Sequence, residues 1–261
     1  MGGRIKISGN SKIPQKVNFK DFLRNSQNKE ELNELISQTV ANTVFQSDQD
    51  VYITQKDSVL HIGPGLEMEV SQYEEADVRI IVHMKHALDC GHENFIVRTS
   101  DTDVLVLIIG HFHKLEEMYS RLRVTVDFGT GKTRKLFDVR GICEKLGRDK
   151  SISLPVFHSF TGTDTTSAFR GRGKKTAWST WEHFSDVTEA FMFMANNPFY
   201  PVDAQAVHFK KLEHFTVLMY DKSAYTESVN DVRRSLFTKK SRSFEHLPPT
   251  QVSNALHYFP I

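Results

Sequence analysis

The chain has 261 residues, 39% of them hydrophobic and 11% aromatic, a composition that can build a sizeable core and argues against a disordered chain. Its 33 Lys and Arg balance its 32 Asp and Glu, so a globally basic nucleic-acid binder is not indicated. Two cysteines are too few for a disulfide scaffold or a cysteine-rich zinc module. The longest apolar run, 104–109, is too short to span a bilayer, and the polar N-terminus lacks a signal-peptide core. We therefore expect a soluble intracellular protein.

The N-terminal segment, 1–65, predicts one helix followed by two short strands. Asn28 stands where it would cap the helix, and Glu31 is placed to complete a capping box. Residues 50–53 and 58–62 then have strand character and are joined by a turn.

The middle of the chain, 66–177, alternates between helical and strand patterns. A helix is predicted over 74–88, and a short buried strand over 95–97. The apolar run at 104–109 is compatible with a strand or with a buried helical turn, and its periodicity does not decide between them.

Two strands and a helix come next, and helices dominate after them. Residues 123–128 and 133–139 flank a Gly-Thr-Gly turn and predict a hairpin. A helix is expected over 139–146, ended by Gly147. From Trp178 to the C-terminus the pattern is helical and amphipathic, so 178–261 is expected to form a helical C-terminal region.

Acidic side chains gather at three loop ends that could converge on hard cations. Residues 67–77 hold five carboxylates and no Lys or Arg. Asp101 and Asp103 follow the strand at 95–97, at the end where open α/β sheets form their sites, and Asp164 lies in a later tight turn. Mg²⁺ needs only a few such oxygen ligands, and a pair of ions can assist phosphodiester cleavage. The alternative is that these are ordinary carboxylates of helix starts and loops.

A basic turn, Arg170–Lys175, offers a second kind of site. A Gly-x-Gly turn that opens a helix presents backbone N–H groups to a phosphate. The cationic side chains around it would add a grip on a nucleic-acid backbone that does not depend on base sequence. A basic surface turn is the alternative interpretation.

Four short motifs occur in a fixed order: EEAD at 74–77, TSDTD at 99–103, TGTD at 161–164 and GRGKK at 171–175. Together they resemble the C-terminal two-thirds of the flap endonuclease (XPG-type, PIN-like) nuclease domain. The similarity covers about residues 70–185, and the order and spacing of the motifs are more specific than any one of them. The amino-acid sequences of these segments resemble even more closely a group of animal proteins, many of them derived from mobile elements.

The resemblance implies a fold, a metal site and a phosphate-binding turn. The fold would be a PIN-like three-layer α/β sandwich with a mostly parallel sheet over 66–177, followed by a helix-two-turn-helix element. Mg²⁺ or Mn²⁺ would be held by five carboxylates, the last three of them catalytic: Glu75, Asp77, Asp101, Asp103 and Asp164. The phosphates of DNA, or alternatively RNA, would be held by the basic turn: Gly171, Arg172, Gly173, Lys174 and Lys175.

One departure from the family concerns residues 1–70. The family's first strands, each of which delivers an aspartate, normally precede the four motifs, and no acidic residue in 1–70 follows a comparable apolar strand. We therefore expect an incomplete metal site.

Two other motifs have simpler interpretations. Gly129–Thr133 lacks the first glycine of the Walker pattern, because Val126 stands there, so a hairpin turn is favoured over a nucleotide site. His83, His86, Cys90 and His92 have zinc-like spacing, but surface histidines on a half-buried helix are the simpler account.

The sequence thus predicts metal-dependent phosphodiester hydrolysis of structured DNA, weakened in this chain. The alternative is a non-catalytic nucleic-acid-binding or scaffold protein that keeps a degenerate PIN-like fold. Either protein is expected to be intracellular and nuclear, without a membrane partner.

Overall fold

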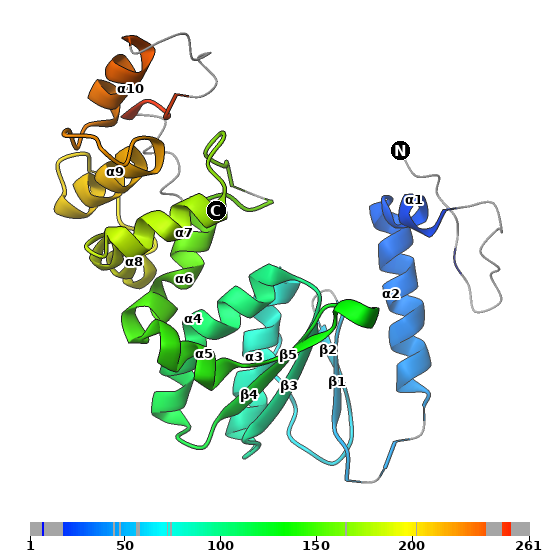
Figure 1. Cartoon of the computed structure of the whole chain (residues 1–261). Coiled ribbons are helices and arrows are strands. Elements are labelled where there is room, and N and C mark those ends of the chain that lie inside the picture. The colour runs from blue at the N-terminus through cyan, green and yellow to red at the C-terminus, as the bar shows by residue number, and fades with distance from the viewer. Residues whose placement is uncertain are drawn as a thin grey trace. The chain divides into compact units, whose positions relative to one another are not determined.

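The computed structural model describes residues 7, 18–43, 45–46, 48–55, 58–71, 73, 75–164, 166–201, 203–238 and 247–251. The chain forms two compact units, Met1–Gly91 and His92–Ile261, which are described separately (Figure 1). It is a mixed α/β protein with small sheets. Within the described residues, no helix combines the length and the apolar character needed to cross a membrane.

The first unit contains a helical pair, a hairpin and a third helix: α1 (Phe19–Leu23), α2 (Ser26–Ala41), β1 (Val51–Gln55), β2 (Ser58–Ile62) and α3 (Ala76–Asp89). The predicted cap of the helix was wrong. Asn25 caps α2, because its side chain accepts hydrogen bonds from the backbone N–H of Gln27 and Asn28. Asn28 itself is buried and donates to the carbonyl of Phe22 at 2.9 Å, so its amide joins α2 to α1 instead.

The two predicted strands are present as β1 and β2, which pair antiparallel, and they contact histidines of α3. Thr54 is hydrogen bonded to the ring of His83 at 2.6 Å, and the Tyr52 ring stacks on His61 and meets His86 edge-on. Burial of His83 lowers its pKa, and His86 and Arg79 lower it further. The predicted helix over 74–88 is confirmed as α3, although Glu74 lies outside the described residues.

The second unit begins with a three-stranded sheet and two helices: β3 (Asn94–Thr99), α4 (Thr102–Met118), β4 (Arg123–Phe128), β5 (Lys135–Asp138) and α5 (Val139–Leu146). β3 and β4 are parallel, as expected, but β5 returns antiparallel to β4, so the sheet is mixed. A short 3-10 turn, Gly131–Thr133, joins β4 to β5. The hairpin interpretation of Gly129–Thr133 is therefore confirmed, and the run 104–109 proves to be helical.

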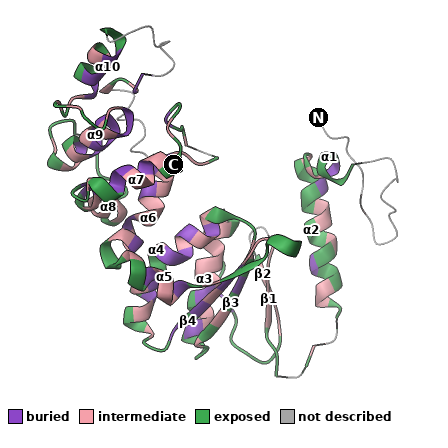
Figure 2. Cartoon of the chain, viewed as in Figure 1, coloured by how far each residue is buried: buried purple, intermediate pink, exposed green. Residues whose placement is uncertain are grey.

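Five helices complete the second unit: α6 (Arg148–Phe160), α7 (Lys174–His183), α8 (Val187–Asn196), α9 (Val207–Tyr220) and α10 (Val229–Thr238). Their buried residues (Figure 2) form one hydrophobic core rich in aromatic rings. Phe191 lies near its centre, with its ring 5.2 Å from Trp181 and 5.6 Å from Phe215. The expected helical C-terminal region is present and starts at α7, four residues before Trp178.

Helices α4 and α6 pack closely against each other where Gly110 faces Pro155. A methyl group at Gly110 would overlap the proline ring, so the absence of a side chain at this position allows the close approach. This contact matters below, because α4 begins and α6 ends with residues of the candidate site.

Candidate functional site

Asp101 and Asp103 lie directly after strand β3, where the chain turns into α4. Asp101 is the N-cap residue of α4, and its side chain accepts a hydrogen bond from the backbone N–H of Asp103 at 3.0 Å. The Thr99 hydroxyl receives the backbone N–H of Asp101 at 3.0 Å, which fixes the turn. Two carboxylates, separated by Thr102, therefore follow the carboxyl end of a parallel strand, as the sequence suggested.

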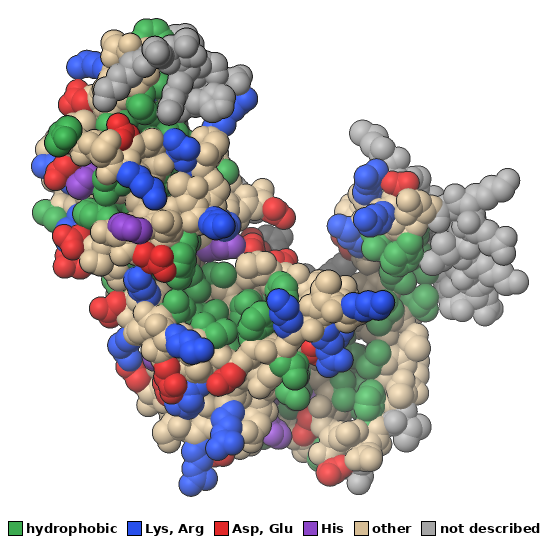
Figure 3. All heavy atoms as spheres, in the orientation of Figure 1, with side chains coloured by type: hydrophobic (Ala, Val, Ile, Leu, Met, Phe, Trp, Pro, Cys, Tyr) green, Lys and Arg blue, Asp and Glu red, His purple; other side chains and the backbone are tan. Residues whose placement is uncertain are grey.

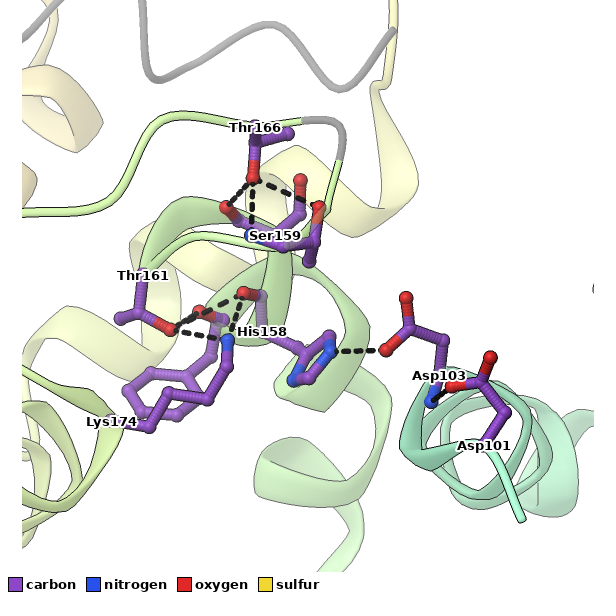
Figure 4. Close-up of polar contacts among 9 residues, drawn as sticks. Asp101, Asp103, His158, Ser159, Thr161, Thr166 and Lys174 are labelled. Carbon is purple, nitrogen blue, oxygen red and sulfur yellow. Dashed lines mark hydrogen bonds and ion pairs between the residues drawn. The ribbon is translucent and has the colours of Figure 1, made fainter. Parts of the chain in front are cut away.

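His158, on the last turn of α6, binds the second of these carboxylates (Figure 4). Its Nε2 lies 2.8 Å from Oδ1 of Asp103, its side chain is mostly buried, and that of Asp103 is partly exposed. His158 belongs to none of the sequence motifs. The two residues are 55 positions apart, and no local spacing pattern connects them.

Lys174, the first residue of α7, ties the end of α6 to the basic turn. Its ammonium group donates to the His158 carbonyl at 2.7 Å and to the Thr161 hydroxyl at 3.2 Å (Figure 4). Burial lowers the pKa of Lys174, and the negative charge of Asp103 opposes that shift. The ammonium group of Lys174 is therefore directed to the carboxyl end of α6, where a positive charge is favourable.

The loop that carries Asp164 is fastened to the same end of α6. The Thr166 hydroxyl donates to the Ser159 carbonyl at 2.8 Å and receives the backbone N–H of Thr163 at 2.8 Å. Gly162 has a φ of +102°, and a side chain there would collide with Ala168, so this tight turn requires glycine. Asp164 is exposed in a loop anchored one residue from His158.

The basic turn is only partly directed outward. Gly171, Gly173 and Lys175 are exposed, and the N-cap Gly173 leaves α7 without a side-chain cap. Arg172 instead folds back onto α9, where its guanidinium lies over the Tyr220 ring at 5.1 Å and donates to the Tyr220 carbonyl at 3.2 Å. Of the three cations predicted at this turn, Lys175 is the exposed one, because Arg172 and Lys174 are engaged by the fold.

The other predicted carboxylates belong to the first unit. Glu75 is the N-cap residue of α3, and Asp77 lies in its first turn. Convergence of these two with Asp101, Asp103 and Asp164 stays a prediction. Throughout the described residues, no three side chains of His, Cys, Asp or Glu come together in a group able to hold a metal ion. The histidines and Cys90 with zinc-like spacing therefore do not form such a group either.

The buried thiol of Cys143 differs from the candidate site in its chemistry. Cys143 is buried against the carbonyl of Ile109, and burial raises its pKa to about 11, which disfavours a thiolate nucleophile. On the face drawn in Figure 3, Lys and Arg side chains are interspersed with Asp, Glu and apolar side chains. Charged function therefore depends on small clusters, as the balanced composition indicated.

No family model matches the sequence, and no curated protein or solved structure is significantly similar to it.

Proposed function

We propose that this chain is a divalent-cation-dependent phosphodiesterase of the PIN-like, flap endonuclease type, which acts on structured DNA or alternatively RNA. The observation that carries this proposal is the meeting of Asp101 and Asp103 with the end of α6, to which the Asp164 loop is fastened. In this proposal the sheet of β3, β4 and β5 belongs to a PIN-like three-layer sandwich that lacks the cover over Ile96 and Leu136, which are exposed.

The carboxylates offer the hard oxygen ligands that Mg²⁺ or Mn²⁺ takes. Asp101 uses Oδ1 to cap α4, and Asp103 uses Oδ1 to bind His158. The described residues hold no ready group of three such side chains, so the proposal requires the exposed Asp164 loop to move toward Asp101 and Asp103 when the cation binds. Glu75 and Asp77 are the further ligands of this proposal. A cation bound there would stabilise the charge that develops on a phosphodiester and activate a water.

The chain's own residues would position the substrate. The exposed Lys175 and the uncapped start of α7 offer a charge and backbone N–H groups to a phosphate. His158 holds Asp103 in one orientation, and Lys174 holds the His158 backbone. These contacts fix the orientation of Asp103 before any ligand binds.

One contact favours the second candidate function, which is nucleic-acid binding without cleavage. Because Oδ1 of Asp103 is already bound by His158, a cation must share that carboxylate or displace the imidazole. Turnover is sensitive to displacements of about 1 Å, which can cost on the order of 10²-fold in rate. We therefore expect weak cation binding and cleavage of a flap or nicked duplex near background.

The test combines a thermal melt with a cleavage assay. Mn²⁺ should raise the melting temperature of the wild type modestly, because the folded state binds the ion more tightly than the unfolded state does. The double variant Asp101→Asn/Asp103→Asn should lose this rise, although asparagine still caps a helix and preserves the fold. Asp186→Asn, at an exposed N-cap position of α8, is the matched control and should keep the rise.

The outcomes separate the two candidate functions. Strong Mn²⁺-dependent cleavage that Asp164→Asn abolishes would establish a complete catalytic site. DNA binding without cleavage or Mn²⁺ stabilisation would establish the non-catalytic function. A chain that binds neither Mn²⁺ nor DNA would contradict both proposals.

A further inference from the structure

Two arginines share one buried carboxylate on an exposed face of the three-stranded sheet. Nη1 of Arg98 lies 2.6 Å from Oδ2 of Asp127, and Nε of Arg134 lies 2.5 Å from Oδ1. The Asp127 side chain is 4% exposed, whereas those of Arg98 and Arg134 are 56% and 54% exposed. A buried anion thus orients two guanidinium groups that solvent can still reach.

Each guanidinium keeps further donors for a ligand. Arginine has five N–H donors in a fixed plane, and its contact with Asp127 uses one atom of each group. Their hydrogen bonds and charges keep the pKa of Asp127 below its ordinary value, with Arg134 the largest contributor. The two cations and one anion therefore carry a net positive charge over the working pH range.

The two arginines supply the positive charge of this face. Strand register pairs Thr125 with Asp138, which places Asp138 on the face of Asp127, and pairs Phe128 with Lys135, which places Lys135 on the other face. An anion that approaches the carboxyl end of this face therefore meets mainly the exposed guanidinium groups of Arg98 and Arg134.

Apolar side chains stand beside the arginines on the same face. Strand register pairs Arg98 with Asp127 and Asp127 with Leu136, so these three side chains project to one side of the sheet. Ile96 shares that side, two positions before Arg98 on β3. Ile96 is 78% exposed and Leu136 is 65% exposed, which is unusual for residues of this size in a sheet.

This cluster lies at the same end of the sheet as the acidic site. Arg98 is the last residue but one of β3, and Asp127 is the last but one of β4. The two strands are parallel, so both residues stand at the carboxyl end from which Asp101 and Asp103 follow. A polymer with repeated phosphates could contact the arginines and the region of the carboxylates together.

We propose that Arg98 and Arg134, oriented by Asp127, form an anchor for the phosphates of single-stranded nucleic acid. The partner is a single strand because its unstacked bases can cover Ile96 and Leu136, whereas a duplex hides its bases within the stack. The path toward Asp101 rests on the proposed function, but the binding itself requires no cleavage.

The experiment measures the affinity of the full chain for a fluorescein-labelled polythymidine strand at several salt concentrations. Arg98→Gln and Arg134→Gln should each weaken binding several-fold at low salt, and each lost phosphate contact should reduce the salt slope by about 0.7. Either single variant leaves Asp127 one arginine partner, so a thermal melt should show that at least one of them folds.

Arg121→Gln is the matched control. Arg121 precedes β4, at the opposite end of the sheet, and pairs with Glu93 at 3.6 Å on the surface. Its replacement removes the same charge and should leave the salt slope unchanged. An equal loss in all three arginine variants would overturn the anchor, because it would show that only net charge matters.

Asp127→Asn gives the sharpest contrast. It raises the net charge by one but removes the anion that orients both arginines, so the anchor predicts weaker binding and a general charge effect predicts tighter binding. Tighter binding by this variant would overturn the proposal. So would preferential binding of the matching duplex, or complete competition by inorganic phosphate at a similar concentration.

The same measurements separate this inference from the proposed function. Binding that depends on the arginines without any Mn²⁺ effect would support the anchor and leave the phosphodiesterase unsupported. Mn²⁺-dependent cleavage with unchanged affinity in Arg98→Gln and Arg134→Gln would do the reverse.

Discussion

The side chains of helices α6–α10 and those at the carboxyl end of the sheet differ in burial and in the contacts they make. Among the helices, large aromatic residues such as Phe191 and Phe215 are fully buried and touch one another. At the end of the sheet, Asp103 and Arg98 remain partly exposed, and each is held by a single partner on another element. We infer that the helices supply most of the stability of the second unit, while the sheet end carries the residues of the candidate site.

The largest effect that would sharpen this comparison is expected from Phe191→Ala. Its ring contacts four other aromatic rings, including Phe157 and Phe160, so truncation should cost about 3–5 kcal/mol of unfolding free energy. Urea denaturation measures the change. Phe199→Ala, at a position that is 96% exposed, is the control and should change stability by less than about 0.5 kcal/mol. Equal losses in both variants would contradict the assignment of the core.

A smaller loss is expected from Glu213→Gln. Glu213 is buried, and its two oxygens accept from the Val229 backbone N–H and the Gln251 side chain, each at 3.0 Å. Glutamine can still accept from the Val229 N–H, but its amide group then faces that of Gln251, which must turn to present its oxygen, so the rearranged pair should cost about 1 kcal/mol. The shift in urea midpoint checks this. Glu227→Gln, on an exposed side chain, should leave the midpoint unchanged.

Two neighbouring lysines test whether stability and binding are separate at the basic turn. Lys174→Met should keep the aliphatic packing but lose two hydrogen bonds at the end of α6, and relief of the lysine's desolvation limits the cost to about 1 kcal/mol. Lys175→Met should leave the melting temperature unchanged and weaken DNA binding. Thermal melts and salt titrations of DNA binding by both variants test this. A stability loss in Lys175→Met together with a binding loss in Lys174→Met would contradict it.

The smallest expected effect is a pH dependence within the first unit. The pKa of His83 lies below its ordinary value of 6.5, so below that pH the unfolded chain binds a proton that the folded chain does not yet accept. The stability of this unit should therefore fall as the pH decreases from 6.5 toward the folded pKa, and should be flat above it. His83→Gln should reduce this slope in the urea midpoints of the first unit. A stability that rises on acidification would contradict this.

Elements with local signals were predictable from the sequence. The strands at β1, β2 and β4 and the helix ended by Gly147 follow from alternation, turn residues and a glycine of positive φ. The run 104–109 was undecidable because a fully apolar segment has no period. It is helical in the fold because Asp101 caps the chain just before it.

The contacts that shape the candidate site were not predictable in this way. Lys174 and Arg172 looked equivalent to Lys175 in the sequence, but their partners lie on α6 and α9, the farthest of them 48 positions away. His158 likewise binds a carboxylate on another helix. Such contacts depend on how helices pack, and residue spacing along one chain carries no record of that packing.

Gly110 affects the distance between Asp103 and His158 through helix packing, without any change of charge. Helix α4 starts beside Asp103 and α6 ends just after His158, and the two helices approach each other where Gly110 faces Pro155, about two turns from Asp103. A side chain at this position would push the two helices apart. The distance between Asp103 and His158 therefore depends on the spacing of α4 and α6. Substitutions at position 110 would set how firmly the imidazole holds the carboxylate while every ionisable group stays in place.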